Sequence, residues 1–411
     1  MDIKDRIDII SSIGEEIIGK DNLEPLLTNK KNIIAYDGFE PSGRMHIAQG
    51  LLRSHNVNKF IKSGVKFKFW VADWFALMNL KLGGDLNKIQ KAGQLMIETW
   101  KACGMNIDSL DNDGNQMIEF IWSSKEINTR SEEYWRLVLD IATKFGLNRI
   151  KKCTQIMGRK EEASIIDKLN ELNENLDKTK QYINDCLESK IYDLNILNEK
   201  MNETKLLINS IINKEELTTE LMTSQIFYPV MQCADIFFLG VDILSLGMDQ
   251  KKVNMLAIEY CDKIKRKNKP IVISHHMLMG LDGSDKMSKS NPDNTIFMDD
   301  NNIEVKRKIT KAFCEPNNIV KNPLLDWAKY LVFPLNNYII IPENKKWNEP
   351  EMIFYNYNDL EQHFADGKVQ PKGLKESMIN HINQLLLPVR EYFINNKNAN
   401  ELLKTVKSFG K

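Results

Sequence analysis

The stretch Ile33–Trp74, which reads IIAYDGFEPSGRMHIAQGLLRSHNVNKFIKSGVKFKFWVADW, contains a strand, a helix and a second strand in succession. Apolar and aromatic residues dominate Ile33–Phe39 and Lys66–Trp74, as expected for strands of a buried sheet. Between them, Met45–Lys62 has apolar residues at helical spacing. Strands connected through a helix pair in parallel, so this stretch predicts an α/β sheet.

The same alternation continues along the chain. Further strands are predicted at Met117–Trp122, Val241–Leu246 and Pro270–His275, and further helices at Asp85–Cys103 and Asp249–Tyr260. This order predicts an α/β fold with a Rossmann-like, doubly wound parallel sheet. Such sheets bind ligands at the carboxyl ends of their strands.

Two segments depart from the α/β alternation. No Gly or Pro occurs between Arg159 and Tyr228, and apolar residues recur there in a rhythm close to the heptad of a coiled coil. We expect a helical hairpin, inserted at about 160–216 into a catalytic domain of residues 1–302. From residue 303 the sequence is polar and helical with scattered aromatic residues, which predicts a second, mainly helical domain at 303–411.

Composition restricts the class of protein. The 56 basic and 56 acidic residues give 56 − 56 = 0 net charge, which excludes a histone-like partner of nucleic acid but not local basic patches. The acidic start MDIKDRIDIISSIGEEI is unlike a signal peptide, and the sequence has no apolar run of membrane-spanning length. The 6 cysteines form no CxxC pair, which indicates reduced thiols. We expect a soluble, cytoplasmic protein without a membrane partner.

Two loops carry residues suited to phosphate chemistry. Gly38–Gly50 combines glycines, a histidine and a helix start, and a helix N-terminus favours phosphate. Gly283–Asn291 places Lys286 and Lys289 three residues apart among hydroxyl groups, a pattern suited to a leaving pyrophosphate. Taken alone, a loop like the first is more often an ordinary turn, and a Lys/Ser run like the second is more often a solvated surface loop.

Together the two loops resemble a known family. PSGRMHIAQG is similar to the HIGH signature of class I aminoacyl-tRNA synthetases, and KMSKS at Lys286–Ser290 is their second signature. The segments YDGFEPSGRMH, YPVMQCADIFFLGVD, GMDQKK and KAFCEPNN resemble tyrosyl-tRNA synthetases of the archaeal and eukaryotic cytosolic type. The resemblance extends from about residue 33 to 393. It implies a tyrosine–tRNA ligase that forms tyrosyl-adenylate from L-tyrosine and ATP and then charges tRNA(Tyr).

The resemblance also implies a tyrosine pocket. Tyr36 and Asp235 match the family positions that hold the substrate phenol, whose hydroxyl both donates and accepts a hydrogen bond. Tyr228, Gln232 and Gln250 match the positions that hold the amino-acid ammonium group. Packing in an ordinary helix remains the alternative for Tyr228 and Gln232.

For the nucleotide, the resemblance implies ATP bound as its Mg²⁺ complex, with no tightly bound cofactor and no resident metal. His46, Lys286 and Lys289 are the expected catalytic residues, because in-line attack on the α-phosphorus needs positioning and charge stabilisation and no covalent intermediate. The expected ATP-binding residues are Gly38, His46, Asp249, Lys286, Met287, Ser288 and Lys289.

The sequence departs from the family pattern in two places. Ala48 and Gln49 replace the third and fourth residues of the HIGH signature, which bears on ATP affinity. In the second domain, Trp347 matches an aromatic residue that stacks on the anticodon, and Gln370 and Gly373 occupy positions where relatives have a His and an Asp. For Trp347, a Trp in a small core is the alternative.

Partners follow from the resemblance and from local charge. The basic strips 149–152, 263–269 and 306–308 suit contacts with tRNA phosphates, although each alone is equally a solvated face. The family is dimeric, so a homodimer is expected. Two alternatives remain open: a tryptophan-specific sister enzyme, and a non-catalytic RNA-binding paralogue for which Ala48 and Gln49 are the support.

Overall fold

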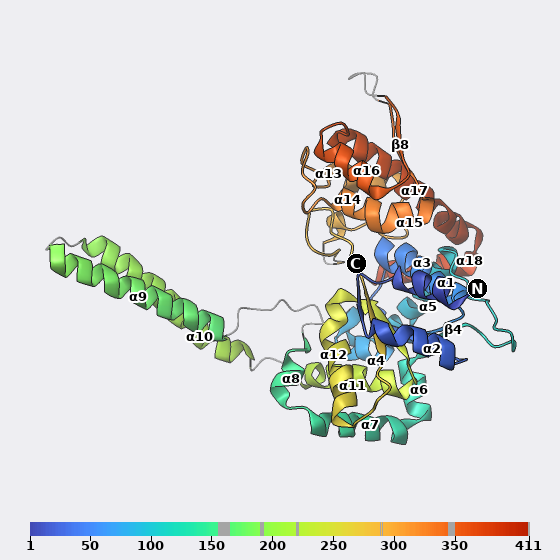
Figure 1. Ribbon diagram of the computed structural model, residues 1–411, viewed down its shortest axis with the longest axis horizontal. Helices are drawn as coiled ribbons and strands as arrows, with labels where there is room; N and C mark the ends of the chain where they lie inside the picture. Colours follow the sequence, from blue (N-terminus) through green and yellow to red (C-terminus); the bar gives the residue numbers. More distant parts are fainter. Residues whose placement is uncertain are drawn as a thin grey trace. The chain divides into compact units, whose positions relative to one another are not determined.

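The computed structural model describes residues 1–154, 165–189, 193–218, 222–287, 289, 291–343 and 350–409. Two compact units emerge (Figure 1): the first unit comprises residues 1–144 and 231–411, and the second unit comprises residues 145–230. The domain division at residue 302 stays a prediction.

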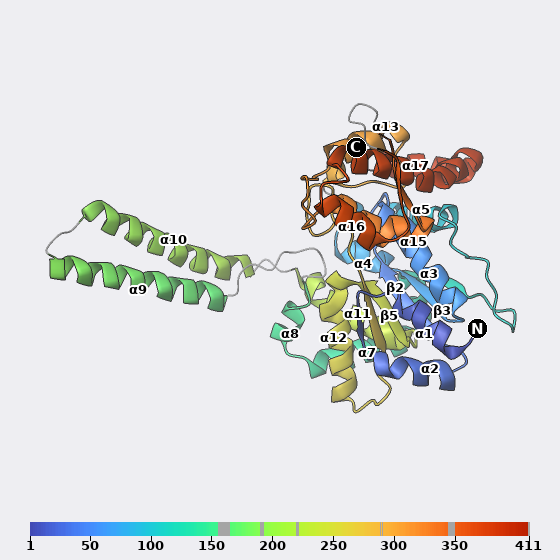
Figure 2. The same ribbon diagram turned by 45° about the horizontal axis from the view of Figure 1, so that its top comes forward.

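A six-stranded sheet forms the centre of the first unit, where β2, β3 and β5 lie side by side (Figure 2). Its order is β1-β6-β5-β2-β3-β4, with β1 antiparallel to β6 and the other pairs parallel. The strands are β1 (Glu16–Ile18), β2 (Ile34–Phe39), β3 (Lys66–Val71), β4 (Ile118–Trp122), β5 (Ile243–Gly247) and β6 (Ile271–His275). The chain changes direction across the sheet between β2 and β5, the point where such sheets bind ligands.

The predicted strands are confirmed, with shifted ends. The expected strand Lys66–Trp74 is too long: β3 ends at Val71 because Asp73 begins α4 (Asp73–Met78) and accepts bonds from Ser123 and Ser124. The strand β1 was not predicted, since three residues are too few for a period-two pattern.

The helices of the first unit surround this sheet and continue to the C-terminus. The predicted helix Met45–Lys62 begins later than expected, as a π-helical turn, η2 (Ala48–Leu52), that continues into α3. The other helices are α1 (Ile3–Ser11), α2 (Leu23–Asn29), α3 (Arg53–Lys62), α5 (Leu86–Ala102), α6 (Ser123–Thr129), α7 (Ser131–Lys144), α12 (Lys251–Lys263), α13 (Asn302–Lys311), α14 (Pro323–Trp327), α15 (Phe333–Asn336), α16 (Tyr357–Ala365), α17 (Pro371–Asn395) and α18 (Lys397–Ser408), with short turns η1 (Lys20–Asn22), η3 (Lys81–Gly84), η5 (Met248–Gln250), η6 (Pro292–Asn294) and η7 (Ala328–Val332).

Alternation along β3 separates two faces of the sheet. On one face, Phe67 contacts Phe60 of α3 and Phe69 stacks with Trp100 of α5. Trp70 points to the opposite face and contacts Phe238 of α11 (Thr223–Phe238). Because β2 pairs in register with β3, Tyr36 shares the α11 face and Asp37 shares the α3 face.

The second unit contains α8 (Leu147–Lys151), α9 (Ile165–Ser189), α10 (Leu194–Thr218) and the first turns of α11. The helices α9 and α10 run side by side in opposite directions in both views (Figures 1 and 2). The antiparallel pairing agrees with the expected helical hairpin, while the apolar residues of the near-heptad pattern are largely exposed: Leu176, Ile183, Leu187, Leu194 and Met201.

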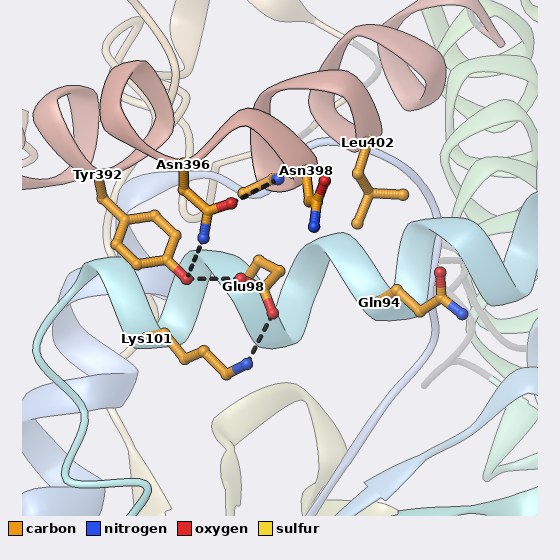
Figure 3. Close-up of a pocket in the computed structure, with 8 residues that line it drawn as sticks. Gln94, Glu98, Lys101, Tyr392, Asn396, Asn398 and Leu402 are labelled. Carbon is orange, nitrogen blue, oxygen red and sulfur yellow. Dashed lines mark hydrogen bonds and ion pairs between the residues drawn. The ribbon is translucent and has the colours of Figure 1, made fainter.

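The C-terminal helices pack on the α/β part of the first unit. The short antiparallel pair β7 (Ile339–Ile341) and β8 (Met352–Phe354) was not predicted and packs on α17. A groove of about 490 Å³ lies between α5 and the α17–α18 junction, and Tyr392 donates there to Glu98 at 2.6 Å. Figure 3 shows the side chains that line it. None of the predicted site residues lines this groove. Among the described residues, no helix is long and apolar enough to cross a membrane.

Candidate active site

A buried carboxyl group lies on the α11 face of the sheet. Asp235 is 0 % exposed, and its Oδ1 accepts a hydrogen bond from the hydroxyl of Tyr134 on α7 at 2.8 Å. Its Oδ2 accepts no hydrogen bond of good geometry from any described residue. Burial raises the pKa of Asp235 well above its ordinary value, while Tyr134 and the indole of Trp70 act in the opposite direction. A buried acceptor without a donor is costly, so this carboxyl is suited to a ligand hydroxyl.

Tyr36 is a second buried polar side chain on this face of the sheet. Its side chain is 1 % exposed, and burial, followed by the charge of Asp235, raises its pKa well above the ordinary value. Tyr36 on β2 and Asp235 on α11 both lie on the α11 face of the sheet. A Cβ built on Gly38 would lie 2.9 Å from the Tyr36 hydroxyl, so only glycine at position 38 leaves that hydroxyl in place. Trp70 Nε1 is buried beside the carboxyl and also lacks a hydrogen bond of good geometry among the described residues.

Two amides expected near the amino-acid ammonium group lie together. Gln232 Nε2 donates to Gln250 Oε1 at 3.1 Å, and Gln232 Oε1 is buried without a hydrogen-bond partner among the described residues. Gln232 lies three residues before Asp235 on α11, so both side chains share a helix face. Tyr228 lies one turn earlier on α11, within the second unit, and its role stays a prediction.

The loop that carries His46 is fixed by a segment far along the chain. Ile47 N donates to Ile296 O at 3.0 Å, and Met298 N donates to Met45 O at 2.9 Å. Burial, followed by the charge of Lys289, lowers the pKa of His46 to about 3, so its imidazole is neutral at pH 7. The backbone N–H of Gln49 donates to His46 Nδ1 at 3.4 Å, which leaves Nε2 as the N–H donor for a ligand.

Lys289 of the KMSKS loop forms a hydrogen bond with the loop that carries the first signature. Its Nζ donates to Ser42 Oγ at 3.1 Å, within the loop that precedes His46. Burial, followed by the charge of Lys81, lowers the pKa of Lys289 to about 8, whereas Glu40 acts in the opposite direction. Lys81 in turn forms an ion pair with Glu40 at 3.5 Å. Two cations near one helix start make an anion site.

Asp249 and Lys286 are also paired. Lys286 Nζ lies 3.1 Å from Asp249 Oδ2, so a lysine of the second signature touches the residue expected at the ribose.

A second ion pair lies on the α3 face of the sheet. Asp37 pairs with buried Arg53 at 2.5 Å, and Arg53 also contacts His275. Burial raises the pKa of Asp37 to about 7, although Arg53 opposes the rise.

The structure therefore brings most predicted site residues into two groups. The first group contains Tyr36, Gly38, Gln232, Asp235 and Gln250; the second contains His46, Asp249, Lys286 and Lys289. Met287 is buried and donates its N–H to Leu278 O, which makes it a packing residue of the loop. Ser288 and Trp347 lie outside the described residues. Gln370 is exposed at the N-terminus of α17, where it donates to Gly367 O.

Several residues with site contacts were not predicted, among them Tyr134, Arg53 and Lys81. Tyr134 sits on an amphipathic helix with no motif around it, so only the fold reveals its bond to Asp235. The sequence does not mark Lys81 either: only the structure shows that it lies between Leu80 and the pair Leu82–Gly83, which all have positive φ. Such backbone conformations are uncommon for leucine and mark loops shaped for a purpose.

The three basic strips differ in exposure. Lys308 in strip 306–308 is 4 % exposed and pairs with Asp300 at 2.6 Å, while Arg307 pairs with Asp293 and Glu304. This strip is therefore largely occupied by internal ion pairs. Strip 263–269 is exposed throughout, and strip 149–152 belongs to the second unit.

Comparison with known proteins identifies the family to which the chain belongs. The family model described as tRNA synthetases class I (W and Y) matches residues 28–173 and 186–387. Tyrosine–tRNA ligase 1, cytoplasmic, of Arabidopsis thaliana is 42% identical over 99% of this chain and 89% of its own length.

Solved structures of tyrosyl-tRNA synthetases are similar to this chain as well. The Leishmania major tyrosyl-tRNA synthetase in complex with tyrosinol has a TM-score of 0.78 and 40% identity and covers 100% of this chain, which spans 53% of the Leishmania chain. The Pyrococcus horikoshii enzyme complexed with L-tyrosine has a TM-score of 0.75 and 27% identity and covers 98% and 100% of the two chains. These similarities confirm the family resemblance and the α/β fold class. The chain belongs to the tyrosine–tRNA ligases, within the class I tRNA synthetases of the W and Y type.

Proposed function

We propose that the chain activates L-tyrosine with ATP and transfers the tyrosyl group to the 3′-terminal adenosine of tRNA(Tyr). The observation that carries the substrate assignment is the carboxyl of Asp235, with Oδ1 occupied by Tyr134 and Oδ2 lacking a donor of good geometry among the described residues. A phenol hydroxyl donates to Oδ2 and accepts from the hydroxyl of Tyr36. An indole N–H can donate but cannot accept, so this pair favours tyrosine over tryptophan.

Rejection of phenylalanine follows from the same contacts. Without the ligand hydroxyl, the buried Asp235 and Tyr36 would both lose a partner, at a cost of several kcal/mol. Discrimination of about 10⁵ without editing is established for this enzyme family. The other contacts of the ligand support this orientation, because Gln232 and Gln250 lie on the side of α11 that also carries Asp235.

Catalysis then consists of charge stabilisation. The carboxylate of tyrosine attacks the α-phosphorus of ATP, the bond to the β-phosphate oxygen breaks, and pyrophosphate leaves with its Mg²⁺ as part of the nucleotide substrate. Lys289 and Lys286 stabilise the leaving group, and the neutral His46 donates its Nε2–H to a phosphate oxygen. Lys81, released from Glu40, supplies a further positive charge beside Lys289. A terminal adenosine hydroxyl of tRNA next attacks the adenylate carbonyl, which releases AMP.

The tRNA contacts, the dimer and the location in the cell are part of the same proposal. Gln370 at the start of α17 and Trp347 contact the anticodon, and the exposed strip 263–269 contacts phosphates. Trp135 and Leu139 are exposed on one side of α7, at 41% and 62%, and form the centre of a homodimer interface. The relatives named cytoplasmic support a cytoplasmic location.

The test is tyrosine-dependent exchange of pyrophosphate into ATP by the purified protein, followed by charging of total tRNA with each amino acid. We expect exchange and charging with tyrosine alone. Exchange with tryptophan would contradict the phenol assignment and favour the sister specificity. Binding of tRNA without formation of any adenylate would favour the non-catalytic paralogue.

A further inference from the structure

The segment Thr295–Asp300 joins three parts of the first unit. It follows the KMSKS loop, and its middle pairs with the loop that carries His46 through a β-bridge between His46 and Phe297. Its acidic end contacts the C-terminal helices, since Asp299 Oδ2 lies 2.8 Å from Lys407 Nζ on α18. The segment is therefore in contact with both the His46 loop and α18.

Arg44, two residues before His46, is held by the same acidic end. Arg44 Nε donates to Asp299 at 2.8 Å and its NH2 donates to Asp300 at 2.9 Å, while the guanidinium lies 4.0 Å from the centre of the Phe297 ring. Asp299 is only 8 % exposed, so the ion pairs are partly shielded from water. Arg44 therefore has little freedom to move independently of the 295–300 segment.

The two carboxylate oxygens of Asp299 contact different elements of the first unit. Oδ1 accepts from Arg44 of the nucleotide loop, and Oδ2 is shared between Arg44 and Lys407 of the C-terminal helix. Asp300 is secured separately by Lys308, at 2.6 Å, and by Arg390, which donates to its backbone oxygen at 2.9 Å. Of the two carboxylates, Asp299 is the one in direct contact with α18.

We propose that Asp299 is a positioning residue that couples the seating of α18 to the nucleotide loop, through Lys407 on one side and Arg44 on the other. This inference rests on the proposed function of the chain. When Lys407 is in place, Asp299 is fixed and orients Arg44, and the paired backbone at residues 45–47 holds His46 at the phosphates. When α18 is displaced, the loop loses one of its fixed points and binds ATP less well, whereas the tyrosine pocket on the opposite face of the sheet is unaffected.

The experiment compares Lys407→Met with the matched variant Lys404→Met, which removes an exposed lysine one turn earlier on α18. In pyrophosphate exchange, Lys407→Met should raise the KM for ATP about three- to fivefold, as expected for a partly exposed ion pair, with the KM for tyrosine unchanged. Lys407→Arg should restore the wild-type value, and Lys404→Met should match wild type.

A double-mutant cycle then tests the route through Asp299. Asp299→Asn should raise the KM for ATP on the order of tenfold or more, and adding Lys407→Met should change it little further, because both substitutions remove the same contact. The inference is overturned if Lys407→Met equals Lys404→Met, if the two effects add, or if the KM for tyrosine rises equally. Absence of exchange in the wild-type protein would instead contradict the proposed function.

Discussion

At the scale of single residues, the specificity of the pocket depends on one carboxyl group and the hydroxyl that orients it. Asp235→Ala removes the acceptor for the phenol, so the KM for tyrosine should rise roughly 10- to 100-fold, the cost of leaving a buried hydroxyl without its partner. Tyr134→Phe leaves the carboxyl but frees its Oδ1, and should raise the KM about fivefold. Exchange assays with tyrosine and phenylalanine measure both effects. Unchanged discrimination in Asp235→Ala would contradict the phenol assignment.

Lys289 gives the reaction an alkaline limit. The pKa of Lys289 is lowered from 10.5 to about 8 by burial and by Lys81, so the side chain is charged below that pH and neutral above it. Because the charge stabilises pyrophosphate, kcat/KM for ATP should fall about tenfold per pH unit above pH 8. The charge of arginine persists in this range, so Lys289→Arg should move the limit upward.

The control for this profile is Lys267→Arg, a substitution in the exposed strip 263–269, which should leave the profile unchanged. An alkaline limit at the same pH in Lys289→Arg would assign the titration to another group. His46 should not produce an acidic limit in the range of the assay, because its pKa is already lowered to about 3.

At the scale of elements, the nucleotide loop depends on the close approach of η2 to the 295–300 segment. A Cβ on Gly50 would lie 2.4 Å from Met298 Sδ, and Met298 is only 2 % exposed. Gly50→Ala should therefore destabilise the fold by about 1–3 kcal/mol, as overpacking does, and raise the KM for ATP. Urea unfolding and exchange kinetics measure the two effects. Adding Met298→Ala should restore part of the stability lost in Gly50→Ala. Wild-type stability and KM in Gly50→Ala would show instead that the Met298 side chain moves aside without cost.

The paired helices α9 and α10 are expected to be dispensable for activation. They pack against each other within the second unit, and none of the residues placed in the two site groups comes from them. Replacing residues 161–214 by a short Gly/Ser linker should leave tyrosine-dependent exchange within about twofold of wild type, because a self-contained insertion is tolerated when its ends stay close. A collapse of adenylate formation, with an unchanged circular dichroism melting curve for the remaining helices, would assign the hairpin a role in the site.

Sequence patterns predicted the elements that repeat a period over many residues. The five parallel strands, the helices at 85–103 and 249–260 and the paired insertion helices each have such a period. The strands β1, β7 and β8 have three residues each and exist only because of a partner strand, so no local pattern marks them. The same holds for the site: motifs located His46 and Lys289, whereas Tyr134 acts through a contact with Asp235, 101 positions away in the sequence.

At the scale of the whole molecule, the zero net charge averages over basic side chains that are paired inside the protein and basic side chains that are exposed to solvent. Some basic side chains form ion pairs within the protein, namely Lys308, Arg53 and Arg44. The strip 263–269, in contrast, is exposed. A neutral chain has little long-range attraction for RNA, so selection of tRNA should depend on local contacts.

The homodimer is the prediction that concerns the molecule as a whole. Trp135 and Leu139 are four residues apart on α7, so both project from the same side of the helix into solvent. Exposed aromatic and aliphatic side chains at helical spacing are typical of the centre of an interface, and a buried charge there has no partner.

Trp135→Glu and Leu139→Glu should each raise the dimer dissociation constant on the order of 100-fold. Sedimentation velocity at several protein concentrations measures this constant. The matched control is Ile394→Glu on α17, which is also exposed, at 73 %, and should leave the dimer intact. A wild-type protein that stays monomeric at all concentrations, or a dimer unaffected by both α7 substitutions, would place the interface elsewhere or exclude it.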